Sequence, residues 1–116
     1  MFTSKRKKIA RYLQNIPVQE RTAFPMLLAD YLDGSLKNDL LSLGMTKLEI
    51  HIDWYDDFHC IGVQGKCKNY YMDLQIYPNQ FTIAFDLDEA DDSTEFTLDS
   101  KEQFYHILSN AIHQFI

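Results

Sequence analysis

The pattern of apolar and polar residues changes its period twice along the chain, from about 3.6 residues to 2 and back again. In the first third, apolar residues recur at helical spacing in three stretches, which predicts three amphipathic helices that each turn one side to a core. The stripes are formed by Ile9, Tyr12, Leu13 and Ile16, by Phe24, Leu27, Leu28, Tyr31 and Leu32, and by Leu36, Leu40, Leu41 and Leu43.

Proline, glycine and serine residues mark the expected ends of these helices. Pro17 should end the first helix, and Pro25 is tolerated near the first turn of the second. Gly34 is a natural C′ residue for the second helix, Ser35 is expected to cap the third, and Gly44 to end it. The front third is therefore predicted to be helical.

From residue 48 onward the period becomes 2. Residues 48–54, 68–77 and 81–87 alternate apolar and polar side chains, which predicts half-buried strands. Residues 58–64 form the strand expected between the first two, and a short strand is expected at 96–98. Turn residues stand between the strands, at Tyr55-Asp56-Asp57 and at Pro78-Asn79-Gln80, and Gly65-Lys66 falls near a further turn. Because these connections are short, consecutive strands should pair as antiparallel hairpins in a meander.

The last stretch returns to helical spacing. Ser100 and Gln103 form a capping-box pattern that starts a helix. Its apolar stripe consists of Phe104, Ile107, Leu108, Ala111, Ile112 and Phe115. Together these elements predict a single α+β domain over residues 1–116, an antiparallel four- to five-stranded meander sheet with N-terminal helices and a C-terminal helix packed on it.

Length and composition agree with one packed domain. A chain of 116 residues with 46% hydrophobic residues can bury a core, so global disorder is not expected. No apolar run approaches the roughly 20 residues that cross a bilayer, so no membrane partner is expected. The basic N-terminus is followed by polar residues, where a signal peptide would be apolar. We therefore expect a cytoplasmic protein.

The chain has two cysteines, Cys60 and Cys67. They are too few for a disulfide framework or a structural zinc site. Because they are expected on opposite sides of a hairpin, a disulfide between them is geometrically conceivable. In a reducing cytoplasm, however, we expect two free and partly buried thiols.

The acidic stretch that starts at Asp86 does not fit a calcium-binding loop. An EF-hand loop counted from Asp86 has Ala90 at position 5, and one counted from Asp88 has Ala90 at position 3. Both registers therefore lack a required oxygen ligand.

The histidines do not fit a zinc template either. His106 and His113 lie seven residues apart, about 10 Å along a helix, which is too far for one metal ion. His59 and Cys60 are neighbours on a strand and should point to opposite faces. No metal or cofactor is expected.

No catalytic signature is present. The chain has no Gly-x-Ser-x-Gly elbow, no P-loop and no Gly-x-Gly-x-x-Gly loop. A Cys60–His51 or Cys67–His59 pair would activate a thiolate if the fold brought it together, but nothing in the pattern positions a third, orienting group. We therefore expect a protein that is not an enzyme. A thiol enzyme is the competing class, and it predicts cysteine reactivity near neutral pH.

The charge of the chain is unevenly distributed around its net value of −6. Through Arg21 there are six basic residues and one acid, a balance of +5, and from Thr22 onward there are five lysines and 16 acids, a balance of −11. Such fields bear on partners and association rates. The basic segment from Lys5 to Arg11 could contact phosphates, but the acidic remainder would repel a nucleic acid duplex. The charge therefore favours a basic protein as the partner.

Two acidic clusters stand out as candidate binding residues. Aromatic residues that could anchor an interface lie beside the first cluster and on the third strand. The predicted partner-binding residues are Asp53, Trp54, Tyr55, Asp56 and Asp57, then Tyr71, then Asp86, Asp88, Glu89, Asp91, Asp92 and Glu95. Because strand directions alternate, the two clusters are expected at opposite ends of the sheet, where they could form separate patches.

The combination of a small acidic α+β chain and an aromatic-rich meander resembles bacterial immunity proteins. The stretches that carry the resemblance are residues 53–58, 70–78 and 85–92. Immunity proteins of this kind neutralise polymorphic or contact-dependent growth-inhibition toxins, many of which are basic nucleases. The resemblance implies stoichiometric inhibition of a basic toxin domain. The alternative is a nucleic-acid-binding or regulatory adaptor that uses the basic N-terminal segment.

Overall fold

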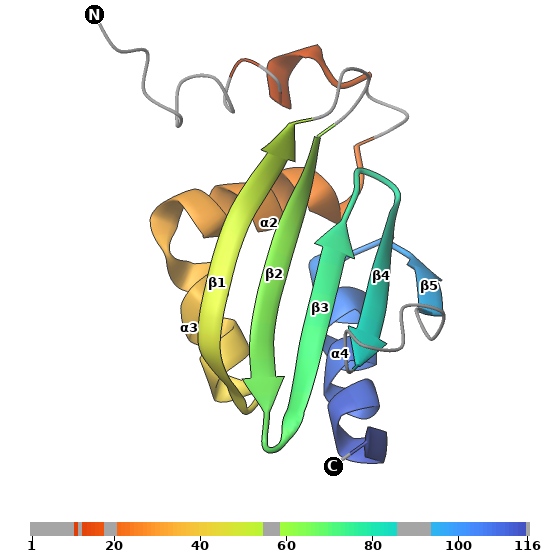
Figure 1. The fold of residues 1–116 in the computed structure, drawn as a ribbon. Coiled ribbons are helices and arrows are strands. Elements are labelled where there is room, and N and C mark those ends of the chain that lie inside the picture. The colour runs from red at the N-terminus through yellow and green to blue at the C-terminus, as the bar shows by residue number, and fades with distance from the viewer. Residues whose placement is uncertain (1–10, 12, 18–20, 55–58, 86–93, 116) are drawn as a thin grey trace, which may run out of the picture.

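The computed structural model describes residues 11, 13–17, 21–54, 59–85 and 94–115 (Figure 1). Arg11 and residues 13–15 are helical and end before Pro17, as predicted. The elements that follow are α2 (Ala23–Asp33), α3 (Ser35–Ser42), β1 (Met45–Trp54), β2 (His59–Cys67), β3 (Tyr70–Ile76), β4 (Gln80–Phe85), β5 (Thr94–Thr97) and α4 (Lys101–Phe115).

The strands form one five-stranded antiparallel sheet in the order β1-β2-β3-β4-β5. Each strand pairs with the next one along the chain, so the sheet is the predicted meander. The fold is α+β, with helices contributed from both halves of the chain (Figure 1). The predicted fold class is confirmed.

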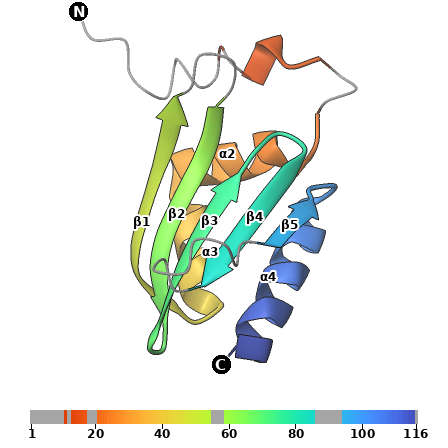
Figure 2. The same ribbon diagram turned by 45° about the vertical axis from the view of Figure 1, so that its right-hand side comes forward.

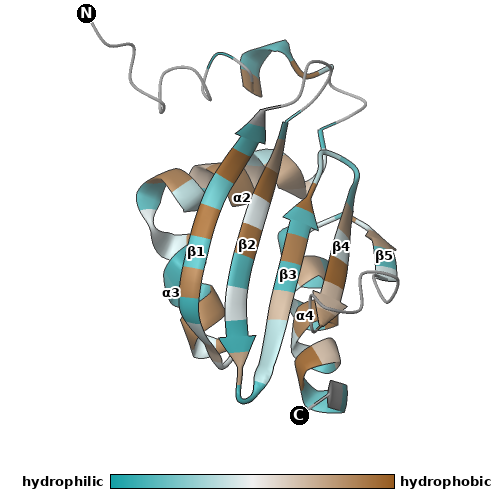
Figure 3. Cartoon of the chain, viewed as in Figure 1, coloured by the Kyte–Doolittle hydropathy of each residue, from teal (hydrophilic) through white to brown (hydrophobic). Residues whose placement is uncertain are grey.

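All three helices α2, α3 and α4 lie on one face of the sheet (Figures 1 and 2). The core forms between this helical layer and the sheet. Phe24 of α2, Phe81 of β4 and Phe104 of α4 are its largest fully buried side chains. The Phe81 and Phe104 rings meet edge to face, with their centroids 5.0 Å apart. The hydrophobic side of each strand thus faces the helices, and the alternation along the strands is visible in Figure 3.

The helix ends follow the sequence signals with one exception. Gly34 ends α2 with φ 86°, and Gly44 follows α3 with φ 101°, both in the left-handed region that favours glycine. The Ser100 hydroxyl accepts a hydrogen bond from the Gln103 N–H at 3.1 Å, as the capping-box pattern predicts. The predicted capping role of Ser35 is wrong: Ser35 is the first residue of α3, and its hydroxyl donates to the Asp30 carbonyl instead.

Two polar contacts fasten α4 to the other helices. The Tyr105 hydroxyl donates a 3.1 Å hydrogen bond to the Asp39 carboxylate of α3. Lys101, in the first turn of α4, forms an ion pair with Asp30 of α2. Burial and the Asp39 carboxylate raise the pKa of Tyr105, so its hydroxyl remains a donor at every physiological pH.

The turn predicted near Gly65-Lys66 lies further along the chain, because both residues belong to β2. The β2–β3 turn consists of Lys68 and Asn69, and Lys68 adopts φ 54°. Glycine is needed at position 65 because Leu48 and the backbone of Thr46 in β1 approach this residue closely. A Cβ atom there would lie 2.8 Å from Leu48 Cδ2 and 3.1 Å from the Thr46 carbonyl oxygen, where β1 has a bulge.

The two cysteines are free thiols, as predicted, but they do not face each other across a hairpin. Both belong to β2, seven residues apart, which separates them by about 23 Å along the strand. Cys67 belongs to the core cluster, whereas Cys60 pairs in register with Asp53 and lies on the other face. A disulfide between them is therefore excluded by geometry.

Candidate protein-binding face

The sheet has a second face, opposite the helical layer, which we call the open face. None of the helices α2, α3 and α4 covers it (Figures 1 and 2). The alternation of side chains and the strand registers assign its members. They are Glu49, His51 and Asp53 of β1, Cys60, Gly62, Gln64 and Lys66 of β2, Tyr71, Asp73 and Gln75 of β3, Thr82 and Ala84 of β4, and Glu95 of β5.

Carboxylates occupy the open face on alternate strands. They come from β1, β3 and β5, namely Glu49, Asp53, Asp73 and Glu95. At the positions paired in register with these carboxylates, β2 and β4 contribute only small or uncharged side chains. The outer acidic strands lie four strand spacings apart, about 19 Å. Lys66 lies on this face and Lys47 lines the hollow beside it, so in the described part of the chain the four carboxylates outnumber the lysines and the face is negatively charged.

Asp53 is the centre of a small polar cluster on the open face. Its carboxylate lies 3.2 Å from His51 Nε2 and 3.9 Å from the Cys60 thiol. Gly62 lies directly beneath the imidazole, because a Cβ atom there would come within 2.6 Å of His51 Nε2. The absence of a side chain at position 62 therefore lets His51 lie flat across β2 and reach Asp53.

Asp73 adds a second carboxylate near this cluster. Partial burial raises its pKa, the His51 charge lowers it, and the negative charge of Asp53 raises it again, with a net upward shift. Two carboxylates thus share a partly desolvated part of the face. A cation from a binding partner would relieve this repulsion.

The two thiols are not activated. Burial and then the charge of Asp53 raise the pKa of Cys60 to about 11, and burial raises the pKa of Cys67. Cys60 contacts Asp53, whereas His51 contacts the other oxygen of the same carboxylate. His59 and Cys67 are at opposite ends of β2. Neither proposed Cys–His pair has the arrangement that makes a thiolate nucleophile.

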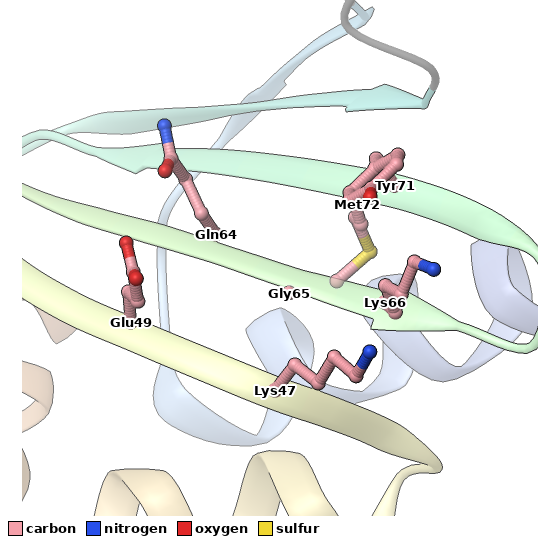
Figure 4. Close-up of a pocket in the computed structure, with 7 residues that line it drawn as sticks. All are labelled: Lys47, Glu49, Gln64, Gly65, Lys66, Tyr71 and Met72. Carbon is pink, nitrogen blue, oxygen red and sulfur yellow. The ribbon is translucent and has the colours of Figure 1, made fainter.

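At the other end of the face, next to the β2–β3 turn, an aromatic side chain is exposed. Tyr71 is 53% exposed, and Lys66 Nζ lies 4.7 Å from the centre of its ring. A shallow hollow of about 310 Å³ adjoins it. Figure 4 shows Glu49 and Gln64 at one end of this hollow and Lys47 and Lys66 at the other. The hollow offers both signs of charge beside an aromatic ring.

The structure brings together part of the predicted binding set. Asp53, Tyr71 and Glu95 lie on the open face. Trp54 ends β1, and its backbone pairs with His59. The ends of β1 and β4, from which the two acidic clusters continue, lie at opposite ends of the sheet, as predicted (Figure 1). The remaining predicted residues lie outside the described residues: Tyr55, Asp56, Asp57, Asp86, Asp88, Glu89, Asp91 and Asp92.

The prediction from sequence missed two carboxylates of the open face, Glu49 and Asp73. Both alternate with apolar residues along their strands, in phase with His51, Asp53 and Gln75. That phase was the available signal, because polar residues two apart on paired strands share a face. Of the basic N-terminal segment, Arg11 is helical and exposed, and residues 5–8 lie outside the described part.

Three further observations bear on function. Among the described residues, no three His, Cys, Asp or Glu side chains are arranged to hold a metal ion. No described helix is long and apolar enough to span a bilayer. In comparisons with known proteins, no family model, no curated protein and no solved structure matched the chain.

Proposed function

We propose that this protein is a stoichiometric inhibitor, an immunity protein, that binds and neutralises a basic toxin domain through its open face. The observation that carries the proposal is the array of carboxylates on β1, β3 and β5, on a sheet face that α2, α3 and α4 leave uncovered. A basic protein surface complements such an array. Nucleases have basic surfaces because they bind phosphates, so a nuclease domain is the expected target.

Electrostatics supports binding rather than stability as the role of this face. The upward pKa shift of Asp73 means that its negative charge is disfavoured in the free protein. An arginine or lysine placed between Asp53 and Asp73 would neutralise both carboxylates. Burial is the largest cause of the pKa shift of Asp73 and the charge of Asp53 a smaller one, so the folded protein retains an unfavourable carboxylate charge that a basic partner would make favourable.

Tyr71 is the exposed aromatic residue best placed to anchor the contact. Tyrosine is enriched at the centres of interfaces, where its ring is buried and its hydroxyl still finds a partner. The ring is already oriented by Lys66, so little side-chain entropy is lost on binding. Removal of this ring is expected to increase the dissociation rate, whereas removal of charge is expected to reduce the association rate.

The proposal can be tested with a basic toxin domain, for which the genes that neighbour the gene of this protein are the first place to search. The open-face variant combines Glu49→Gln, Asp73→Asn and Glu95→Gln. The matched control combines Asp33→Asn, Asp99→Asn and Glu102→Gln, three described acids away from the open face. Both variants lose three negative charges, so the comparison separates the position of the charge from net charge.

The open-face variant should associate with the toxin at least about tenfold more slowly at low salt, and its rate should depend less on salt. The control variant should stay close to the original protein in association rate and in rescue of toxin-inhibited growth. Equal effects of the two variants would contradict the assignment of the open face. Neutralising Asp88, Glu89, Asp91 and Asp92 together, outside the described residues, is likewise predicted to slow association.

A further inference from the structure

A second binding feature lies at the side of the sheet rather than on its face. β1 is an edge strand, and within the described part of the chain it pairs with β2 alone (Figure 1). The backbone N–H and C=O groups of every second residue of β1 therefore point to its outer edge, away from β2. Such an edge can accept another strand unless it is protected.

The protection is confined to one end of β1. The register shift between Thr46 and Glu49 is a bulge, and Lys47 stands in it with φ 53°. A bulge and a lysine are the usual devices that prevent edge pairing. Beyond Glu49 the register with β2 is regular up to Trp54. The segment 49–53, about 17 Å long, is therefore the part of the edge open to pairing.

A groove runs beside this same segment, between the edge of β1 and the turn that joins α2 and α3. Its volume is about 510 Å³, and it is lined by Tyr31, Gly34 and Lys37 of the helical layer and by Leu48 and Ile50 of β1. Leu48 and Ile50 are only partly buried. A strand added to β1 would place alternate side chains in this groove, where apolar groups would complete the burial of Leu48 and Ile50.

The other side chains of an added strand would lie on the open face beside β1. There they would contact His51 and the carboxylates of Glu49 and Asp53. Opposite charges on neighbouring strands attract, and like charges repel. Basic residues opposite the two carboxylates are therefore favoured, and apolar residues are favoured between them.

We propose that the 49–53 edge of β1 is a docking site for an extended segment of a partner protein in which basic and apolar residues alternate. The segment adds a sixth strand to the sheet through its backbone. Its apolar side chains enter the groove beside Tyr31, and its basic side chains pair with Glu49 and Asp53. This site shares Glu49 and Asp53 with the open face, but its backbone contacts are made at the outer edge of β1, and it does not depend on the partner being a toxin.

A second copy of this chain fits the edge less well. Antiparallel self-pairing centred on His51 would set Glu49 of one copy against Asp53 of the other, which is repulsive. Self-pairing centred on Ile50 would bring the helices beside β1 of both copies to the same side of the joined sheet, because opposed residues of an antiparallel pair share a face. A single extended segment meets neither obstacle.

The test uses the full protein and a fluorescent nine-residue peptide of alternating lysine and valine, capped at both ends. Two further peptides have the same sequence but carry N-methyl groups on every valine or on every lysine. In an extended strand these two sets of N–H groups point to opposite edges, so each N-methyl series blocks one edge only. Binding is measured by fluorescence anisotropy.

We expect the unmodified peptide to bind, one N-methyl series to lose binding, and the other to retain it. Glu49→Lys should weaken binding at least about fivefold, because an attractive cross-strand pair becomes repulsive, while Glu102→Lys on α4 makes the same charge change without effect. Nuclear magnetic resonance should show slower amide exchange within residues 49–53. Equal binding of both N-methyl series, no binding of the unmodified peptide, or dimers of the protein formed through β1 would overturn the proposal.

Discussion

The two glycines of β2 lie on opposite faces of the sheet, and replacing each by alanine is a direct test of which face is packed. Gly65 faces the helical layer. A Cβ atom at position 65 would lie 2.8 Å from Leu48 Cδ2, 3.0 Å from Met45 Cε and 3.1 Å from the Thr46 carbonyl oxygen. Met45 is 1% exposed, and the carbonyl belongs to the backbone, so the neighbours have little room to move.

Overpacking of this kind costs about 1–3 kcal/mol. Replacing glycine by alanine within a strand also stabilises the protein by about 0.5–1 kcal/mol, because alanine loses less backbone entropy on folding. Gly65→Ala should therefore lower the free energy of unfolding by about 0–2.5 kcal/mol, with a central value of about 1 kcal/mol.

Gly62→Ala is the matched control on the open face. The new Cβ atom would meet His51 Nε2 at 2.6 Å and Asp53 Oδ2 at 3.1 Å. The His51 side chain is 43% exposed and can swing into solvent. The change would give up the exposed contact between His51 and Asp53, which is worth about 0–1 kcal/mol, and the gain in strand entropy offsets this loss. The expected change in the free energy of unfolding is within about 1 kcal/mol of zero.

Urea unfolding followed by circular dichroism measures both effects. With a slope of about 1–3 kcal/mol per molar urea for a small protein, Gly65→Ala should move the midpoint down by about 0.5 M with an unchanged slope. Gly62→Ala should leave it nearly in place. If Gly62→Ala destabilised the protein as much as Gly65→Ala, the assignment of the packed and open faces would be wrong.

Three other predictions follow from individual contacts. Tyr105→Phe removes the hydrogen bond to the Asp39 carboxylate and should lower the free energy of unfolding by about 1.5–3 kcal/mol in urea titrations; an unchanged midpoint would mean that this contact contributes nothing. Asp73→Asn should be more favourable to stability at pH 7 than at pH 4. Because the folded-state pKa of Asp73 is raised above its unfolded value of 3.8, this carboxyl group contributes to stability below pH 3.8, and the contribution is lost as the pH rises through the folded-state pKa. Asparagine does not titrate, so it does not undergo this loss. Urea titrations of both proteins at the two pH values check this, and the reverse order would refute it. Burial raises the pKa of both thiols, that of Cys60 to about 11, so Cys60 and Cys67 should react with a thiol reagent at pH 7.5 only in urea. Rapid labelling of the folded protein would instead support the hypothesis of a thiol enzyme.

Periodicity predicted the architecture because local pattern and tertiary burial agree along most of the chain. The stripe of Phe104 and Leu108 became the buried side of α4, and the alternation around Leu74 became the buried side of β3. The positions of Gly34 and Gly44 also followed from a local requirement, a positive φ after a helix.

The errors arose where long-range packing overrode a local signal. Gly65 is a turn residue by composition, but in the fold it makes room for Leu48 across the β1 bulge. Lys68, which carries no turn signal, takes the positive φ of the hairpin instead. The misplaced turn then put Cys60 and Cys67 on different strands, although both lie on β2.

The candidate site was predicted only in part, for a related reason. Runs of acidic residues, such as that around Asp56, are conspicuous in a sequence, whereas Glu49 and Asp73 are single carboxylates 24 positions apart. They share a face only because β2 lies between their strands and keeps both in phase. The pairing register that joins them is a tertiary property, but the phase of each strand could have been determined from the alternation alone.

Carboxyl footprinting of the protein, free and mixed with the proposed toxin partner, tests the central claim most directly. A carbodiimide and an amine label exposed carboxylates, and mass spectrometry measures the extent of labelling at each one. The proposed function predicts that the toxin protects Glu49, Asp53 and Glu95 on the open face, while Asp99 and Glu102 stay equally labelled. Protection of Asp99 and Glu102 with unchanged labelling of the open face would contradict it.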